Sequence, residues 1–90
     1  MCEWCAQLPL TKQIFTPRAY EEIIACIKEL VEQRQIILVK GSCPLGQHRH
    51  PDGSWVGDVI FHTIQCPRCG ELFTCSVDTY HGGGSFRQGE

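Results

Sequence analysis

The sequence predicts an α+β fold in which one N-terminal amphipathic helix packs on a three- or four-stranded, mostly antiparallel sheet. An apolar stripe with helical spacing begins at residue 17, and three strand-like runs follow it, at 36–39, 55–65 and 72–77. A Cys-x-x-Cys turn at residues 66–69 joins the last two runs. This turn predicts a zinc-knuckle hairpin that holds a metal at its tip.

The helix has clear start signals and a single apolar face. Thr16 is a favourable N-cap, Pro17 suits the first helical position, and Phe15 with Tyr20 predicts a hydrophobic staple. Apolar residues then recur at three- and four-residue steps: Tyr20, Ile23, Ile24, Ile27, Leu30 and Val31. We therefore expect this stripe to face the sheet, with Cys26 packing at its edge.

The remaining segments are predicted from turn residues and alternation. Residues 8–15 are predicted to be a short extended segment, which Pro9 limits to the edge of a sheet. Gly41 ends the first strand, and Pro51-Asp52-Gly53 makes a turn in the loop that follows. Cys75 alternates in phase with Phe73 and Val77, which favours a core position for its thiol. We expect residues 82–90 to form a mobile tail.

The segment Cys66-Pro67-Arg68-Cys69-Gly70 is typical of a turn that wraps two thiolates around zinc. A zinc site needs about four ligands, and a second Cys-x-x-Cys pair stands at Cys2 and Cys5. Closing a loop of about sixty residues costs roughly 4 kcal/mol, whereas structural zinc contributes about 10–16 kcal/mol. We therefore predict one zinc ion bound by Cys2, Cys5, Cys66 and Cys69.

A rival ligand set uses the central loop in place of the N-terminal pair. Cys43 with either His48 or His50 would stand about twenty residues before Cys66 and Cys69, which is a usual ribbon spacing. This alternative leaves one of the two histidines and the thiols of residues 2 and 5 unused. Tetrahedral thiolates suit zinc, although iron can occupy the same kind of cage.

Composition narrows the functional class of this 90-residue chain, which we expect to be one small zinc-stabilised domain. Eight Lys and Arg against ten Asp and Glu give a net charge of −2, which disfavours generic nucleic-acid binding. The chain shows no secretory leader pattern and no apolar run of about 20 residues that would predict a membrane span. Seven cysteines, an odd number, favour a reduced cytoplasmic protein with a metal over a disulfide framework.

No catalytic arrangement is required by the spacing of the residues. Cys43 could combine with His62 or His81 and with Asp58 or Asp78 as a nucleophilic set, but any cysteine-rich chain of this size offers such combinations. A zinc site closed by four thiolates also leaves no open position for water. We therefore expect a protein that is not an enzyme.

Two groups of residues suggest a surface for a protein partner. Glu21, Glu22, Glu29 and Glu32 fall mainly on the solvated side of the helix. Tyr80, His81 and Phe86 flank a glycine run and are of types that anchor interfaces. An acidic helix beside an aromatic C-terminal loop favours a basic protein partner.

Residues 66–77 resemble the second half of a zinc ribbon. Together with Asp78-Thr79-Tyr80-His81-Gly82-Gly83-Gly84-Ser85, the ending Cys66-x-x-Cys69-Gly70-x-x-Phe73 resembles small bacterial immunity proteins from toxin and contact-dependent inhibition loci. The resemblance implies that the chain binds and blocks a cognate toxin. The alternative is a zinc-ribbon module that binds nucleic acid or transcription machinery through Lys40, Arg49, Arg68, Arg87 and the histidines.

Overall fold

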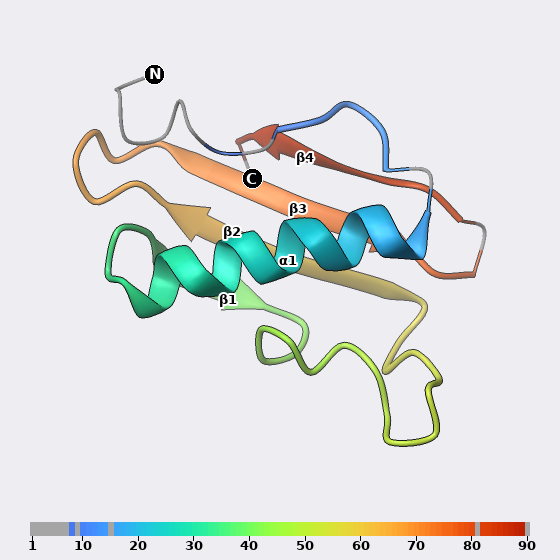
Figure 1. The fold of residues 1–90 in the computed structure, drawn as a ribbon. Helices are drawn as coiled ribbons and strands as arrows, with labels where there is room; N and C mark the ends of the chain where they lie inside the picture. The colour runs from blue at the N-terminus through green and yellow to red at the C-terminus, as the bar shows by residue number, and fades with distance from the viewer. Residues whose placement is uncertain (1–7, 9, 15, 81, 90) are drawn as a thin grey trace.

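One helix lies across one face of a four-stranded antiparallel sheet whose strand order is β1-β2-β3-β4 (Figure 1). The computed structural model describes residues 8, 10–14, 16–80 and 82–89. The elements are α1 (Pro17–Glu32), β1 (Ile37–Gly41), β2 (Val59–Gln65), β3 (Leu72–Asp78) and β4 (Gly84–Gln88). The predicted α+β class is thus confirmed, with four strands in the sheet. Within the described part of the chain, no helix is long and apolar enough to cross a membrane.

Helix α1 begins and packs as its sequence predicts. The hydroxyl of Thr16 accepts a hydrogen bond from the Ala19 amide at 3.1 Å, and Pro17 occupies the first turn. Five residues of the predicted stripe are buried, namely Tyr20, Ile23, Ile24, Ile27 and Leu30, and the sixth, Val31, is partly buried. Phe15, the other half of the predicted staple, lies outside the described residues. Arg34, with φ of 62°, then reverses the chain toward β1.

The buried core lies between α1 and alternate residues of the two central strands. Ile60, His62 and Ile64 of β2 stand opposite Val77, Cys75 and Phe73 of β3, and all six are buried. Because side chains alternate across a strand, these residues share the face that α1 covers. The predicted core position of Cys75 is therefore confirmed.

Strand β2 starts later than the sequence predicts. It begins at Val59, and Trp55 lies in the preceding loop, where it forms an isolated bridge with Arg49. The backbone carbonyls of Gly57 and Asp58 accept hydrogen bonds from Thr79. The Thr79 hydroxyl donates to the Gly57 carbonyl at 2.7 Å, and the Thr79 amide donates to the Asp58 carbonyl at 2.7 Å. The β-branched and aromatic composition of residues 55–58 is thus outweighed by these loop contacts.

Residues assigned above to a mobile tail form part of the sheet. β4 pairs with β3 along its length and buries Phe86 opposite Cys75. On its outer edge, Thr11 exchanges two backbone hydrogen bonds of 2.9 Å with Phe86, and the Ile14 amide donates to Gly84 at 2.7 Å. The predicted extended segment before the helix therefore covers this edge of the sheet, as its sequence suggested.

Candidate functional site

The Cys-x-x-Cys segment forms the tip of the hairpin between β2 and β3. The amide of Gly70 donates to the Cys66 carbonyl at 2.9 Å, and the Cys66 amide donates to Glu71 at 3.0 Å. Gly70 has φ of 79°, in the left-handed region that glycine adopts without strain. The Gln65 side chain also donates to the Gly70 carbonyl at 3.2 Å. These bonds hold both cysteines on one short, closed turn.

The two thiols of this turn differ in exposure. Cys66 is fully buried, whereas Cys69 is exposed. The predicted partner ligands Cys2 and Cys5 lie outside the described residues. Among the residues that the structure describes, no group of three or more His, Cys, Asp or Glu side chains is arranged to hold a metal ion. The turn can therefore supply two sulfur ligands, and the prediction that Cys2 and Cys5 complete a zinc site concerns residues outside the described part of the chain.

The rival ligand set is not assembled. Cys43 lies beside His62, because Gly41 pairs with His62 in the β1–β2 register. Cys66 stands four residues after His62, which separates the two positions by about 13 Å along an extended strand. Two sulfur ligands of one zinc ion lie only about 4 Å apart. His48 packs against Tyr20 and Trp55, while His50 is exposed. The sheet register thus separates Cys43 from the Cys66–Cys69 turn.

Cys43 and His62 do meet, but in an arrangement that does not activate the thiol. The Cys43 Sγ atom lies 3.9 Å from His62 Nε2. The same nitrogen donates to the Cys43 carbonyl oxygen at 2.7 Å, so Nε2 carries the proton and has no lone pair for the thiol. Burial raises the pKa of Cys43, and it raises the pKa of Cys75 to about 12.

An aromatic cluster that the sequence analysis did not single out attaches the long loop to α1. His48 lies edge-on to Tyr20, with ring centroids 5.3 Å apart, and 5.8 Å from the ring of Trp55. Arg49 stacks 4.2 Å above Trp55 and forms a 2.8 Å ion pair with Glu21. The only sequence signal for this contact between the loop and α1 is the mixture of aromatic and basic residues in the loop. The sequence does not show which face of the helix the loop reaches.

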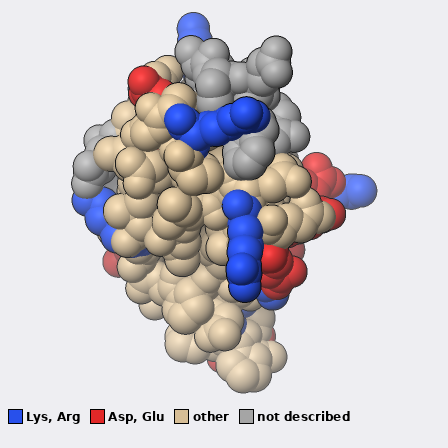
Figure 2. Space-filling model, turned by 90° about the vertical axis from the view of Figure 1, so that its left-hand side faces the viewer, with Lys and Arg blue, Asp and Glu red and all other residues tan. Residues whose placement is uncertain are grey.

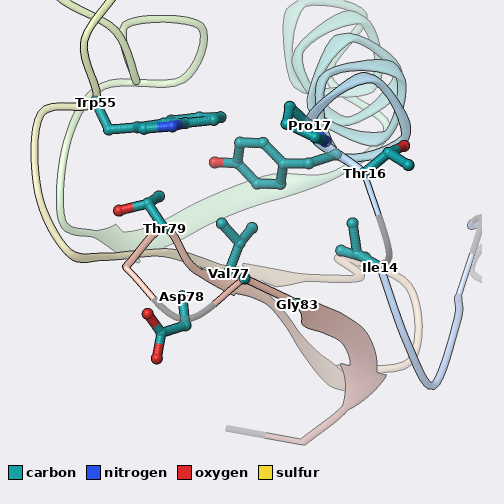
Figure 3. Close-up of a pocket in the computed structure, with 10 residues that line it drawn as sticks. Ile14, Thr16, Pro17, Trp55, Val77, Asp78, Thr79 and Gly83 are labelled. Carbon is teal, nitrogen blue, oxygen red and sulfur yellow. The ribbon is translucent and has the colours of Figure 1, made fainter.

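A small cavity opens beside this cluster, between the start of α1 and the β3–β4 connection (Figure 3). Its volume is about 90 Å³, and its walls include Ile14, Pro17, Trp55 and Val77. Figure 3 shows the Asp78 carboxylate turned away from Trp55. Pockets for drug-sized ligands measure about 300–1,000 Å³, so this cavity suits a single apolar side chain.

The predicted partner-binding residues divide into exposed and buried ones. Glu22, Glu29 and Glu32 are exposed, while Glu21 is only partly exposed and engages Arg49. Tyr80 is 76% exposed, but Phe86 is 0% exposed. Assigning Phe86 to the surface was therefore wrong, because its ring completes the core under α1. His81 lies outside the described residues.

The basic residues of the nucleic-acid alternative do not form one surface. Arg49 is engaged by Glu21 and Trp55. Lys40 and Arg87 stand on different edge strands, and Arg68 is exposed at the hairpin tip. Figure 2 shows the side of the molecule that carries this tip, where basic side chains are separated by uncharged surface and accompanied by acidic neighbours. This distribution lacks the continuous basic stripe expected for generic nucleic-acid binding.

Comparison of the chain with protein-family models, curated proteins and solved structures finds no match in any of the three. The fold assignment therefore comes from the structure itself. The resemblance of about residues 66–86 to bacterial immunity proteins stays a prediction.

Proposed function

We propose that this chain is a non-enzymatic protein-binding module that binds and blocks a basic partner, specifically a cognate bacterial toxin. In this proposal a zinc ion stabilises the scaffold, and the acidic side of α1 provides the contact surface. The proposed setting is the cytoplasm, where the thiols stay reduced.

The observation that carries the proposal is the rigid display of carboxylates along α1. Glu22, Glu29 and Glu32 are exposed on a helix whose opposite side is buried in the core. The helix therefore cannot rotate or shift without exposing Ile27, which is fully buried. Arg18 pairs with Glu22 at 3.4 Å, so the three carboxylates leave this side of the helix with a net negative charge. Such a charge speeds encounter with a basic surface and disfavours acidic partners.

Tyr80 adds an aromatic anchor near one end of this surface. It follows β3, and its backbone amide donates to the Asp78 carboxylate at 3.0 Å, which fixes the turn. The small apolar cavity lies between the start of α1 and this same connection, where it could receive one side chain of the partner. Interfaces are usually dominated by a few anchors of this kind.

Zinc has a structural role in the proposal. Cys66 and Cys69 would supply two thiolates from the hairpin tip, and Cys2 and Cys5 would supply the other two. Such a clip joins the N-terminal segment to the β2–β3 hairpin and compensates for the small core of a 90-residue chain. Four thiolates close the coordination sphere, so no reaction is assigned to the metal.

Co-expression with the product of the neighbouring reading frame tests the function. We expect the chain to restore growth to cells that express a toxic neighbour and to form a one-to-one complex with it. Replacing Glu22, Glu29 and Glu32 together with Lys should abolish both effects, whereas Asp52→Lys, at an exposed turn in the loop between β1 and β2, should leave both intact. Full protection by the triple variant would contradict the assigned surface, and no protection or complex with the unaltered chain would contradict the function.

A further inference from the structure

The face of the sheet opposite α1 has a different chemistry from the helix side. Phe73, Cys75 and Val77 point toward α1, so the alternate residues Thr74 and Ser76 point to the other face. The register aligns Arg87 with Thr74 and Ser85 with Ser76, which places all four side chains on that face. Figure 1 shows α1 on one side of the sheet only.

Two adjoining hollows lie on this helix-free face. Their volumes are about 390 and 380 Å³, and they share Ser76, Ser85 and Arg87 in their walls. Thr74 and Gln88 belong to the first hollow, and Lys12 and Gln13 to the second. The two hollows therefore adjoin at Ser76, Ser85 and Arg87, on the surface of β3, β4 and residues 12–14, and we call them together the polar depression.

The charge in this depression is entirely positive among the described residues. Lys12 and Arg87 are the charged residues in its walls, and no carboxylate lines either hollow. Neither cation forms an ion pair with a described carboxylate. The Nε atom of Arg87 donates to the Ser85 hydroxyl at 3.2 Å, which leaves the terminal guanidinium nitrogens to meet a ligand.

The fold, rather than the local sequence, brings the two cations together. Thr11 pairs antiparallel with Phe86, which places Lys12 opposite Ser85, and Lys12 and Arg87 line the same hollow although they lie far apart in the sequence. Gly84 allows β4 to approach β3 closely, because a Cβ atom there would lie 2.8 Å from the Cα atom of Val77. Ser76 and Ser85 line the same hollow as Lys12 and Arg87.

We propose that this depression binds the phosphate monoester of a small phosphorylated ligand, through Lys12, Arg87, Ser76 and Ser85. Arginine and lysine beside serine hydroxyls are the usual protein partners of phosphate oxygens. The hollows are within the volume range of small-molecule sites. No aromatic side chain lines them among the described residues, so a base-stacking platform for single-stranded nucleic acid is missing. The inference goes beyond partner binding by α1 and does not depend on it, because it concerns the opposite face.

Titration of the ¹⁵N-labelled protein with ribose 5-phosphate tests this site, with ribose and a short oligothymidylate as comparison probes. We expect ribose 5-phosphate to shift the amide resonances of Ser76, Ser85 and Arg87 at millimolar concentration, and ribose to shift none. Arg87→Gln and Lys12→Gln should each weaken binding about tenfold, the usual loss for one charge-assisted hydrogen bond. Arg18→Gln is the matched control, because Arg18 is an exposed cation that pairs with Glu22 on the helix.

Three results would overturn the proposal. The first is the absence of shifts with ribose 5-phosphate while the protein spectrum is that of a folded domain. The second is unchanged binding by the Lys12→Gln, Arg87→Gln double variant, which would move the phosphate elsewhere. The third is tighter binding of the oligothymidylate than of the monoester, which would assign the face to nucleic acid instead.

Discussion

The Nε2 atom of His62 donates to the carbonyl oxygen of Cys43 across 2.7 Å, which joins the residues after β1 to the middle of β2. The bond fixes the tautomer of the imidazole and removes the nitrogen that could have served as a base for the Cys43 thiol. The contact between Cys43 and His62 therefore has a structural role, because it holds the residues after β1 against β2. A reactive thiol would need a lowered pKa, whereas burial raises the pKa of Cys43.

Alkylation of Cys43 should consequently be slow. In the whole chain analysed by mass spectrometry, iodoacetamide should modify Cys43 more slowly in the folded than in the urea-unfolded protein. The physical reason is the raised pKa, which lowers the thiolate fraction at neutral pH. Faster modification in the folded protein would show that His62 activates the thiol.

Stability should fall as the pH is lowered through the histidine range. Burial lowers the pKa of His62, with the bond to Cys43 opposing it, and burial also lowers the pKa of His48, with Glu21 opposing it. The unfolded chain therefore binds protons first, near pH 6.5, and stability present above that pH is lost progressively below it. Urea midpoints measured between about pH 7.5 and about pH 5.5 should decrease.

Substitution of the two histidines separates their contribution to the pH dependence of stability from that of the cysteines. His62→Gln and His48→Gln should each reduce the pH dependence of the urea midpoint. An unchanged pH dependence in both variants would place the titration on other groups, including metal-bound thiolates.

The two aromatic residues near the C-terminal strand should respond differently to truncation. Phe86→Ala should lower the free energy of unfolding by about 3–5 kcal/mol, because it empties a fully buried ring site. Tyr80→Ala should change it by less than about 0.5 kcal/mol, because the side chain is 76% exposed. Chemical unfolding of both variants measures these changes. An equally small loss of unfolding free energy in both variants would show that Phe86 is not buried.

Gly84 should be intolerant of a side chain. Gly84→Ala would place a Cβ atom 2.8 Å from the Cα atom of Val77, so β4 must move and stability should fall by about 1–3 kcal/mol. Gly57→Ala is the matched control, because the nearest atom to its added Cβ would be 3.7 Å away. Thermal unfolding of the two variants should rank them in that order, and a destabilised Gly57→Ala beside an unaffected Gly84→Ala would contradict the β3–β4 packing.

The parts of the fold that sequence could predict are those set by local signals. Thr16, Pro17 and the apolar stripe predict α1 from residues close together in the sequence, and alternation predicts the core position of Cys75. β4 was missed because the run Gly82-Gly83-Gly84 at its start is typical of a loop, and only pairing with β3 and the 11–14 segment makes it a strand. Phe86 was misplaced for the same reason.

The candidate site was predictable only where its residues are adjacent in sequence. The spacing of Cys66 and Cys69 predicts their turn, and Gly70 adopts the left-handed φ that the turn requires. The contact of His48 with Tyr20 and the proximity of Lys12 to Arg87 depend on tertiary structure, which no local pattern encodes. The same limit explains why spacing suggested Cys43 as a ligand, although the β1–β2 register holds it beside His62.

The zinc content of the freshly purified, tag-free protein tests the central claim most directly. Elemental analysis should find one zinc per chain, lost in a Cys66→Ser, Cys69→Ser variant and in a Cys2→Ser, Cys5→Ser variant, but kept in Cys43→Ser. Removal of the metal should also unfold or strongly destabilise the chain. A protein that is free of metal yet fully folded, or one that keeps its zinc without Cys2 and Cys5, would contradict the zinc-clipped scaffold.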